Sequence, residues 1–326
     1  MRHIGVIGGG AWGTALAQVA SAGGPVTLWA REPEVVAGIN ANHINDAFLP
    51  GVPLDPGVRA TGDLADLGSC DAWLVVTPAQ FLRAVLSHAP TDPARPLVLC
   101  SKGIEAGSGE LMSEVAAEAV PGAPIAVLSG PTFAHEVAKG LPTAVTLACT
   151  DASCAGRLAE RLAQPTFRPY ASKDVVGAEV GGAVKNVLAI ACGAVVGRRL
   201  GENAKAALIA RGFAEMLRFG LARGAQESTL GGLSGLGDLV LTCSSPQSRN
   251  MSLGMGLGEG RRAADLLAER RTVAEGASTA PVLLAVAQAL GIDMPITQSV
   301  VALLDGAPID AVIGKLLNRP LKSEGV

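Results

Sequence analysis

The sequence predicts an α/β fold in which a doubly wound, mostly parallel sheet is followed by an all-α C-terminal domain. Three observations predict this fold class. A short apolar run near the N-terminus leads into a glycine-rich turn and an Ala/Leu-rich segment. Short apolar runs then alternate with helical patterns, and from about Asp174 long Ala/Leu/Val segments at helical spacing run to the end. Short strands separated by helices are typical of a parallel sheet with helices on both faces.

The first strand and turn carry the most specific pattern. The apolar residues 4–7 precede residues 8–13, which read GGGAWG and have the spacing G-x-G-x-x-G. Gly8 allows the tight turn, Gly10 lets a pyrophosphate approach the backbone, and Gly13 lets the helix pack close to the sheet. Because the chain has 41 glycines, an ordinary strand-turn-helix connection is the competing interpretation. The position after a strand and before a helix favours a Rossmann-like dinucleotide site.

The residues after the second predicted strand bear on the choice of dinucleotide. That strand covers residues 26–30, and Arg31, Glu32 and Pro33 follow it. An acidic residue at this point binds the ribose of NAD, whereas an arginine suits the 2′-phosphate of NADP. Glu32 is also read as an acidic residue just before a helix that starts at Pro33. Arg31 therefore favours NADP(H), with NAD(H) as the alternative, unless Arg31 is only a solvated surface residue.

The remaining elements are expected to alternate in the first domain. Strands are predicted at residues 72–76, 97–100, 125–128, 144–148 and 166–170. Helices are predicted at residues 79–88, 108–120 and 152–164. Later helical segments are broken by glycine-rich stretches near residues 231–237 and 254–260. We expect a dinucleotide-binding domain at residues 1–180 and a helical substrate-binding and catalytic domain at residues 181–326.

Composition narrows the classes of function. The net charge of −3 and scattered basic residues argue against a nucleic-acid partner. Six cysteines without a C-x-x-C pair, mostly in apolar segments, indicate buried free thiols and no metal site. The first strand begins too early for a secretory signal, and the longest apolar run, residues 187–196, is too short for a membrane span. We therefore expect a cytoplasmic protein with no membrane span.

Three segments follow predicted strands at the edge where ligands bind in parallel sheets. They are residues 76–78, 100–103 and 128–132. Lys102 lies in the second segment, which makes it a candidate to contact cofactor or substrate. A surface lysine on a loop is the competing interpretation.

Lys185 is a sharper candidate. It is the one cation in residues 183–191, which are otherwise apolar on nearly every side of a predicted helix. A buried ammonium is costly unless it is paired, and burial lowers the pKa of a lysine. A lysine with such a pKa suits general acid or base chemistry near neutral pH, as a ketone reductase requires. The alternative is a lysine that reaches the surface along its methylene groups.

A third group of candidates follows a glycine-rich stretch. Asp238 lies in residues 231–243 and could orient a lysine, and Ser248, Arg249 and Asn250 offer hydroxyl, guanidinium and amide donors to an anion such as phosphate. A flexible glycine loop before a polar helix start is the competing interpretation.

In order and spacing, these motifs resemble NAD(P)-dependent glycerol-3-phosphate dehydrogenase of the bacterial type. The resemblance covers nearly the whole chain, and several motifs are long and specific to that family. The matching segments are residues 8–17, 101–103, 130–134, the helix around Lys185 and Asn186, and residues 203–212, 235–250 and 273–276.

The resemblance implies roles position by position. Lys185 matches the proton acceptor for glycerol 3-phosphate oxidation, Lys102 matches a residue shared by substrate and cofactor, and we expect Asp238 to hold and charge Lys185. The positions matched to substrate contacts are Lys102, Gly130, Thr132, Lys185, Asp238, Ser248, Arg249 and Asn250. The expected cofactor contacts are Gly8, Gly10, Trp12, Gly13, Arg31, Lys102, Ala134, Arg249, Val273 and Glu275. The chain departs from the usual pattern at Ala11, which lacks a hydroxyl common in the family, and at Thr132, which replaces the commoner serine.

The resemblance thus implies reversible hydride transfer that reduces dihydroxyacetone phosphate to sn-glycerol 3-phosphate for glycerophospholipid synthesis, in a homodimer. Two alternatives remain. Another Rossmann dehydrogenase, acting on a β-hydroxy acid, would share the first domain and a buried lysine followed by asparagine, but it does not account for residues 235–250. A non-enzymatic dinucleotide sensor would bind NADPH without turning over a triose phosphate.

Overall fold

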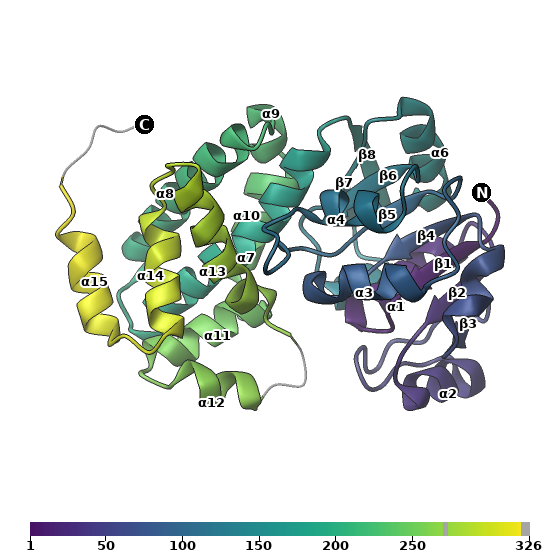
Figure 1. Cartoon of the computed structure of the whole chain (residues 1–326). Coiled ribbons are helices and arrows are strands. Elements are labelled where there is room, and N and C mark those ends of the chain that lie inside the picture. The colour runs from purple at the N-terminus through teal and green to yellow at the C-terminus, as the bar shows by residue number, and fades with distance from the viewer. Residues whose placement is uncertain (270–272, 321–326) are drawn as a thin grey trace. The chain divides into compact units, whose positions relative to one another are not determined.

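The computed structural model describes residues 1–269 and 273–320 (Figure 1). The chain forms two compact units. The first comprises Met1–Ser101 and Met112–Ala178, and the second comprises Lys102–Leu111 and the chain from Glu179 onward.

The first unit is built on an eight-stranded sheet with the order β3-β2-β1-β4-β5-β6-β7-β8. Neighbouring strands are parallel except for the pair β6 and β7. The order reverses between β1 and β4, so the predicted doubly wound, mostly parallel sheet is confirmed. The strands are β1 (Ile4–Ile7), β2 (Val26–Trp29), β3 (Val58–Thr61), β4 (Ala72–Val75), β5 (Leu97–Leu99), β6 (Ile125–Ser129), β7 (Thr143–Cys149) and β8 (Phe167–Ser172).

Helices cover both faces of this sheet. One core contains side chains from the sheet and from α1, α2, α5 and α6, including Leu16 and Leu158. The other contains side chains from the sheet and from α3 and α4, including Leu82 and Val115. The helices are α1 (Ala11–Ser21), α2 (Pro33–Asn42), α3 (Leu82–His88), α4 (Met112–Ala119), α5 (Ala134–Ala138) and α6 (Ala152–Leu162), with 3-10 turns at η1 (Leu64–Ser69) and η2 (Ala79–Phe81).

Two differences from the predicted elements have clear physical causes. The edge strand β3 was not predicted, because its four residues include the exposed Arg59 and carry little apolar signal. The helix predicted for residues 108–120 begins only at Met112, because Gly107 and Gly109 have φ of +91° and +75° and therefore cannot be helical. The residues before Met112 belong to the second unit.

All regular elements of the second unit that lie in the described residues are helical, as predicted. The segment η3 is a short π-helix that runs directly into α10. The elements are α7 (Val175–Gly197), which starts at the end of the first unit, α8 (Glu202–Ala222), α9 (Glu227–Leu230), η3 (Leu233–Gly237), α10 (Asp238–Ser244), α11 (Arg249–Gly258), α12 (Ala263–Ala268), α13 (Glu275–Ala289), α14 (Pro295–Leu304) and α15 (Ile309–Leu317).

The helix α7 extends well beyond the apolar run at residues 187–196 that the sequence showed. At 23 residues, with a mean hydropathy of 1.7 in its most apolar stretch, it could cross a bilayer by length and composition. Only the apolar run at residues 187–196 had been considered, so the statement that no apolar segment is long enough to cross a bilayer was wrong. Because 89% of that stretch is buried inside the protein, a place in a helical core accounts for its composition. No other helix in the described part of the chain meets the same criterion.

The helices α7 and α11 approach each other until their backbones touch. A Cβ on Gly193 would lie 2.1 Å from the carbonyl oxygen of Met251, and a Cβ on Gly254 would lie 2.0 Å from the carbonyl oxygen of Ile190. Only glycine fits at such a crossing. The two helices are therefore held in a fixed register, which matters because both carry candidate site residues.

Glu215 on α8 is a buried carboxylate that holds the start of α14. Its oxygens accept hydrogen bonds from the backbone amides of Ile296 (2.5 Å) and Thr297 (3.1 Å) and from the Thr297 hydroxyl (3.0 Å). Burial raises the pKa of Glu215 to about 7, although these donors and Arg218 act in the opposite direction. The folded protein therefore favours the protonated carboxyl more than the unfolded chain does.

We expect Glu215→Gln to change how stability depends on pH. Because the pKa of Glu215 is higher in the folded state, wild-type stability rises as pH falls from 8 to 5, by about 3 kcal/mol relative to the variant. Urea unfolding at several pH values measures this difference. Glu227→Gln, at an exposed position on α9, is the control, and parallel curves for wild type and Glu215→Gln would contradict the assignment.

Candidate active site

The turn after β1 has the geometry of a phosphate-binding loop. Gly8 has φ of +128°, and a Cβ on Gly13 would lie 1.8 Å from the carbonyl oxygen of Gly8. Gly10 differs, since a Cβ there would meet no atom within 4 Å. Gly10 also caps α1 without any side-chain hydrogen bond, and the first turn of α1 holds no acidic residue. Open space in front of unshielded amide groups suits a pyrophosphate.

Asn45 supports this loop and was not predicted. Its buried amide donates to the carbonyl oxygen of Gly9 at 2.8 Å and to the Thr14 hydroxyl at 2.7 Å. The contact ties a distant loop to the glycine turn. A single asparagine between secondary-structure elements carries no sequence signal for this role.

The other cofactor contacts expected in the first unit differ in exposure. The side chain of Arg31 is 81% exposed and pairs with Glu32 at 3.0 Å. Glu32 occupies the N-cap position of α2, with Pro33 next. Trp12 lies in the first turn of α1 and is partly buried, and Ala134 begins α5. An exposed guanidinium at this place can bind a phosphate by charge.

Gly130 and Thr132 form a turn at the carboxyl end of β6. Gly130 has φ of +148°, and a Cβ there would lie 3.0 Å from the Cα of Val145. The Thr132 hydroxyl donates to the carbonyl oxygen of Gly130 at 3.3 Å. The turn therefore requires glycine and holds a hydroxyl at the edge where ligands bind in sheets of this type.

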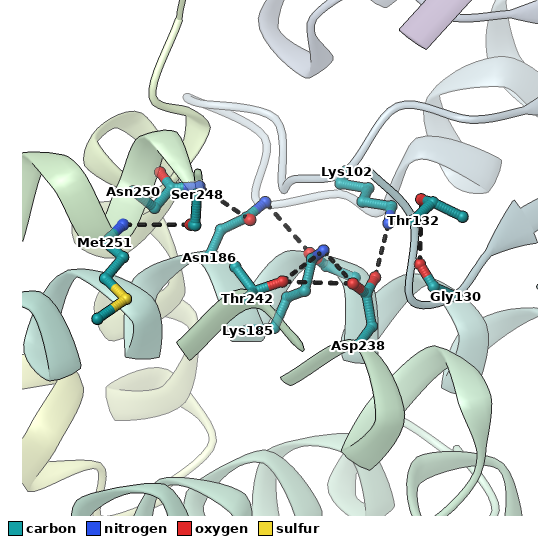
Figure 2. Close-up of polar contacts among 11 residues, drawn as sticks. Lys102, Gly130, Thr132, Lys185, Asn186, Asp238, Thr242, Ser248, Asn250 and Met251 are labelled. Atoms are coloured by element: carbon teal, nitrogen blue, oxygen red, sulfur yellow. Dashed lines mark hydrogen bonds and ion pairs between the residues drawn. The ribbon is translucent and has the colours of Figure 1, made fainter. Parts of the chain in front are cut away.

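In the second unit, Asp238 joins two lysines (Figure 2). The carboxylate, at the start of α10, accepts from Lys185 on α7 at 2.5 Å and from Lys102 at 2.6 Å, one lysine on each oxygen. The Asp238 side chain is fully buried, and Lys185 and Lys102 are only 7% and 13% exposed. Two ammonium groups share one carboxylate, so the cluster carries an excess of positive charge when both lysines are protonated.

The electrostatics of this cluster favour proton transfer near neutral pH. Burial lowers the pKa of Lys185 to about 8. Asp238 raises the pKa of Lys185, while Lys102 lowers it further. Lys185 lies in an apolar helix and is paired with Asp238, as the sequence predicts. A lysine with this pKa can give or take a proton at physiological pH.

Thr242 completes the hydrogen bonds around Lys185 and was not predicted. Its hydroxyl accepts from the Lys185 ammonium at 3.0 Å and donates to Asp238 at 3.3 Å. Thr242 lies one helical turn after Asp238, so the spacing of four residues on α10 could have identified it.

The start of α11 holds the polar residues predicted there. The Ser248 hydroxyl caps the helix by accepting from the amide of Met251 at 3.2 Å. The side chain of Asn250 donates to the side-chain oxygen of Asn186 at 2.9 Å and accepts from the amide of Gly276 at 2.9 Å. Asn186 was not predicted, and it connects this helix start to the residue next to Lys185.

The structure therefore brings Lys102, Lys185 and Asp238 into direct contact, and it links Asn250 to α7. Ser248 and Arg249 open α11, Glu275 opens α13, and Val273 is 47% exposed. All six cysteines are buried and unbridged, as expected. The described residues contain no group of three or more His, Cys, Asp or Glu that could hold a metal ion.

Comparisons with known proteins match nearly the whole chain to a single family. The family model for the N-terminus of NAD-dependent glycerol-3-phosphate dehydrogenase matches residues 3–155, and the model for its C-terminus matches residues 174–313. A glycerol-3-phosphate dehydrogenase [NAD(P)+] of Erythrobacter litoralis is 64% identical over 323 residues, covering 99% of this chain and 98% of the relative. One from Caulobacter vibrioides is 60% identical over 327 residues, covering 99% of each. The crystal structure of glycerol-3-phosphate dehydrogenase from Coxiella burnetii has a TM-score of 0.92 at 38% identity, covering 98% of this chain and 99% of that one.

Proposed function

Because the chain belongs to the NAD-dependent glycerol-3-phosphate dehydrogenase family, we propose that it reduces dihydroxyacetone phosphate reversibly to sn-glycerol 3-phosphate with NAD(P)H. The observation that carries the proposal is the buried pairing of Lys102 and Lys185 with Asp238. When bound, the dinucleotide supplies the hydride. The residues of the protein must then hold the phosphate, orient the carbonyl group and deliver a proton.

Lys185 is the proton donor in this reaction and the acceptor in the reverse direction. As the C2 carbonyl becomes an alkoxide, the Lys185 ammonium stabilises the negative charge and then transfers its proton to that oxygen. Asp238 holds the ammonium in place and raises its pKa against burial. Thr242 fixes the direction of the amine through a second hydrogen bond. Lys102 adds a positive charge that favours an anionic substrate.

The start of α11 is the proposed phosphate site of the substrate. The Arg249 guanidinium supplies charge, and the first amide groups of the helix point toward an anion. Ser248 can still donate its hydroxyl proton while it caps the helix, and the Asn250 amide has a second N–H beyond the one used by Asn186. Gly130 and Thr132 are proposed as further substrate contacts, as the family resemblance implies.

The dinucleotide is proposed to bind at the glycine loop of the first unit. The residues assigned to it are Gly8, Gly10, Trp12, Gly13, Arg31, Lys102, Ala134, Arg249, Val273 and Glu275. The open space at Gly10 and the exposed Arg31 support this assignment. Arg31 favours NADP(H) over NAD(H).

We propose that the protein acts in the cytoplasm as a homodimer and supplies sn-glycerol 3-phosphate for glycerophospholipid synthesis. Residues 1–180 bind the dinucleotide, and residues 181–326 carry the substrate site and the catalytic chemistry. The two units of the structure differ from this division in one respect, since Lys102–Leu111 folds with the helical unit and the whole charged cluster therefore lies in that unit.

Lys185→Ala should lower kcat by about 10² to 10⁴-fold, because a general acid is lost, while the affinity for NADPH stays unchanged. Absorbance at 340 nm with dihydroxyacetone phosphate and either NADPH or NADH measures this and ranks the two cofactors. Lys205→Ala, at a lysine on α8 outside the cluster, is the control. Near-normal turnover in Lys185→Ala would contradict the assignment of Lys185 as the proton donor. If the wild-type protein binds NADPH but does not turn over dihydroxyacetone phosphate, the result would instead favour a non-enzymatic dinucleotide sensor.

The rate of reduction should depend on pH through Lys185. Because the donor must be protonated and its pKa is about 8, kcat/KM for dihydroxyacetone phosphate should fall above pH 8. Asp238→Asn removes the charge that raises this pKa, so the fall should begin at a lower pH. Asp310→Asn, at an exposed carboxylate on α15, should leave the profile unchanged. An unmoved profile in Asp238→Asn would contradict the coupling.

Two glycine substitutions should distinguish an effect on dinucleotide binding from an effect on folding stability. Gly10→Ala adds a methyl group in open space, so we expect folding stability to change by less than about 1 kcal/mol and NADPH affinity to fall at least tenfold. In Gly13→Ala the new methyl group would overlap the carbonyl oxygen of Gly8, so both folding stability and NADPH affinity should fall. Thermal unfolding and fluorescence titration with NADPH measure the two effects. Unchanged affinity in Gly10→Ala would exclude this loop as the pyrophosphate site.

A further inference from the structure

The segment Lys102–Leu111, which we call the strap, folds with the second unit although its chain neighbours belong to the first. The strap is closed on itself. Ile104 and Leu111 pair in an antiparallel bridge and are buried, and the amide of Glu105 donates to the carbonyl oxygen of Glu110 at 2.9 Å. The strap is therefore an ordered loop, and Lys102 is its first residue.

Gly109 of the strap approaches α13 closely. Gly109 has φ of +75°, a conformation that favours glycine, and a Cβ there would lie 2.9 Å from Cγ2 of Val286. The amide of Gly109 donates to the carbonyl oxygen of Glu105 at 3.0 Å, so this contact is joined to the hydrogen bonds that close the strap. Gly109 therefore takes part both in the contact with α13 and in the hydrogen bonding of the strap.

The other end of α13 is joined to the opposite side of the cluster. The amide of Gly276 donates to Asn250, and Asn250 donates to Asn186, the neighbour of Lys185. A Cβ on Gly276 would lie 2.5 Å from the carbonyl oxygen of Asn186, so this end is also in tight contact. The helix α13 thus connects the strap to α7, which carries the second lysine of the cluster.

We propose that the strap, through its seat on α13, positions the Lys102 ammonium on Asp238, so that Gly109 and Val286 are positioning residues of the active site. The kinetic meaning of this inference rests on the function proposed above, whereas the geometry does not. The effect of both residues on the reaction is exerted through Lys102.

Displacement of the strap has a predictable electrostatic sign. Lys102 lowers the pKa of Lys185, and Asp238, which the two lysines share, raises it. If the Lys102 ammonium moves away, Lys185 loses a neighbouring cation and keeps the carboxylate to itself. The pKa of Lys185 should then rise, which is opposite to the effect of Asp238→Asn.

The test is an NMR titration of Lys185 in the full-length protein labelled with ¹³C-lysine, with the signal assigned by Lys185→Arg. In Gly109→Ala the midpoint should rise by about half a pH unit, since moving a unit charge by about 1 Å at a distance near 4 Å changes the interaction by that order. Gly107→Ala is the matched control. Gly107 also has positive φ, at +91°, but a Cβ there would meet no atom within 4 Å.

Further variants test whether the effect passes through Val286 and Lys102. Val286→Ala added to Gly109→Ala makes room for the new methyl group and should return the midpoint toward the wild-type value. Lys102→Met should raise the midpoint by itself, and Gly109→Ala should add nothing further in that background. If Gly109→Ala does not fold, Val286→Ala alone loosens the seat without adding atoms and should produce a smaller shift of the same sign.

An unchanged midpoint in Gly109→Ala, or an equal shift in Gly107→Ala, would overturn the positioning role. The titration needs neither substrate nor cofactor. If the wild type fails to reduce dihydroxyacetone phosphate and the midpoint still shifts, the proposed function fails and the strap proposal stands. If turnover is normal and the midpoint does not move, only the strap proposal fails.

Discussion

The carboxylate of Asp238 is the group on which the candidate site depends. It is fully buried, and each of its oxygens binds one ammonium group. Without it, Lys102 and Lys185 would be two cations in a poorly solvated space with no opposite charge between them, which is a costly arrangement. With it, both lysines remain in place, and the pKa of Lys185, at about 8, still allows proton exchange near physiological pH. A single acidic side chain thus holds the two lysines of this cluster together.

The surrounding helices have little freedom to change this arrangement. Glycines at the crossing of α7 and α11 bring main chains into contact, and Gly276 does the same for α13. Contacts of this kind leave no room for rotation of side chains, and packed protein interiors transmit displacement instead of absorbing it. The high apolar content of α7 follows from the same requirement, since this helix is surrounded by protein along nearly its whole length.

Much of this was predictable where local chemistry demands one residue type. The loop at Gly8, Gly10 and Gly13 was recognisable from its spacing: the backbone disfavours a side chain at Gly8 and Gly13, whereas Gly10 leaves open space for a ligand. Lys185 stood out as one cation in an apolar helix. Asn45 was not predictable, since its hydrogen bonds join segments distant along the chain. The late start of α4 depends on the backbone conformation of Gly107 and Gly109, which residue type alone does not fix. The family resemblance supplied roles for the polar residues at the start of α11, but not the hydrogen bonds that Ser248 and Asn250 already make within the protein.

The strap also limits how this chain can be taken apart. Lys102 follows a strand of the sheet in sequence but belongs to the helical unit in structure, so the two units are not two consecutive pieces of chain. A hybrid made by joining residues 1–180 of one homologue to the remainder of another would place a foreign strap against the native α13 and Asp238. Recombination between relatives is therefore expected to preserve the charged cluster only when Lys102–Leu111 and the helices that hold it come from the same parent.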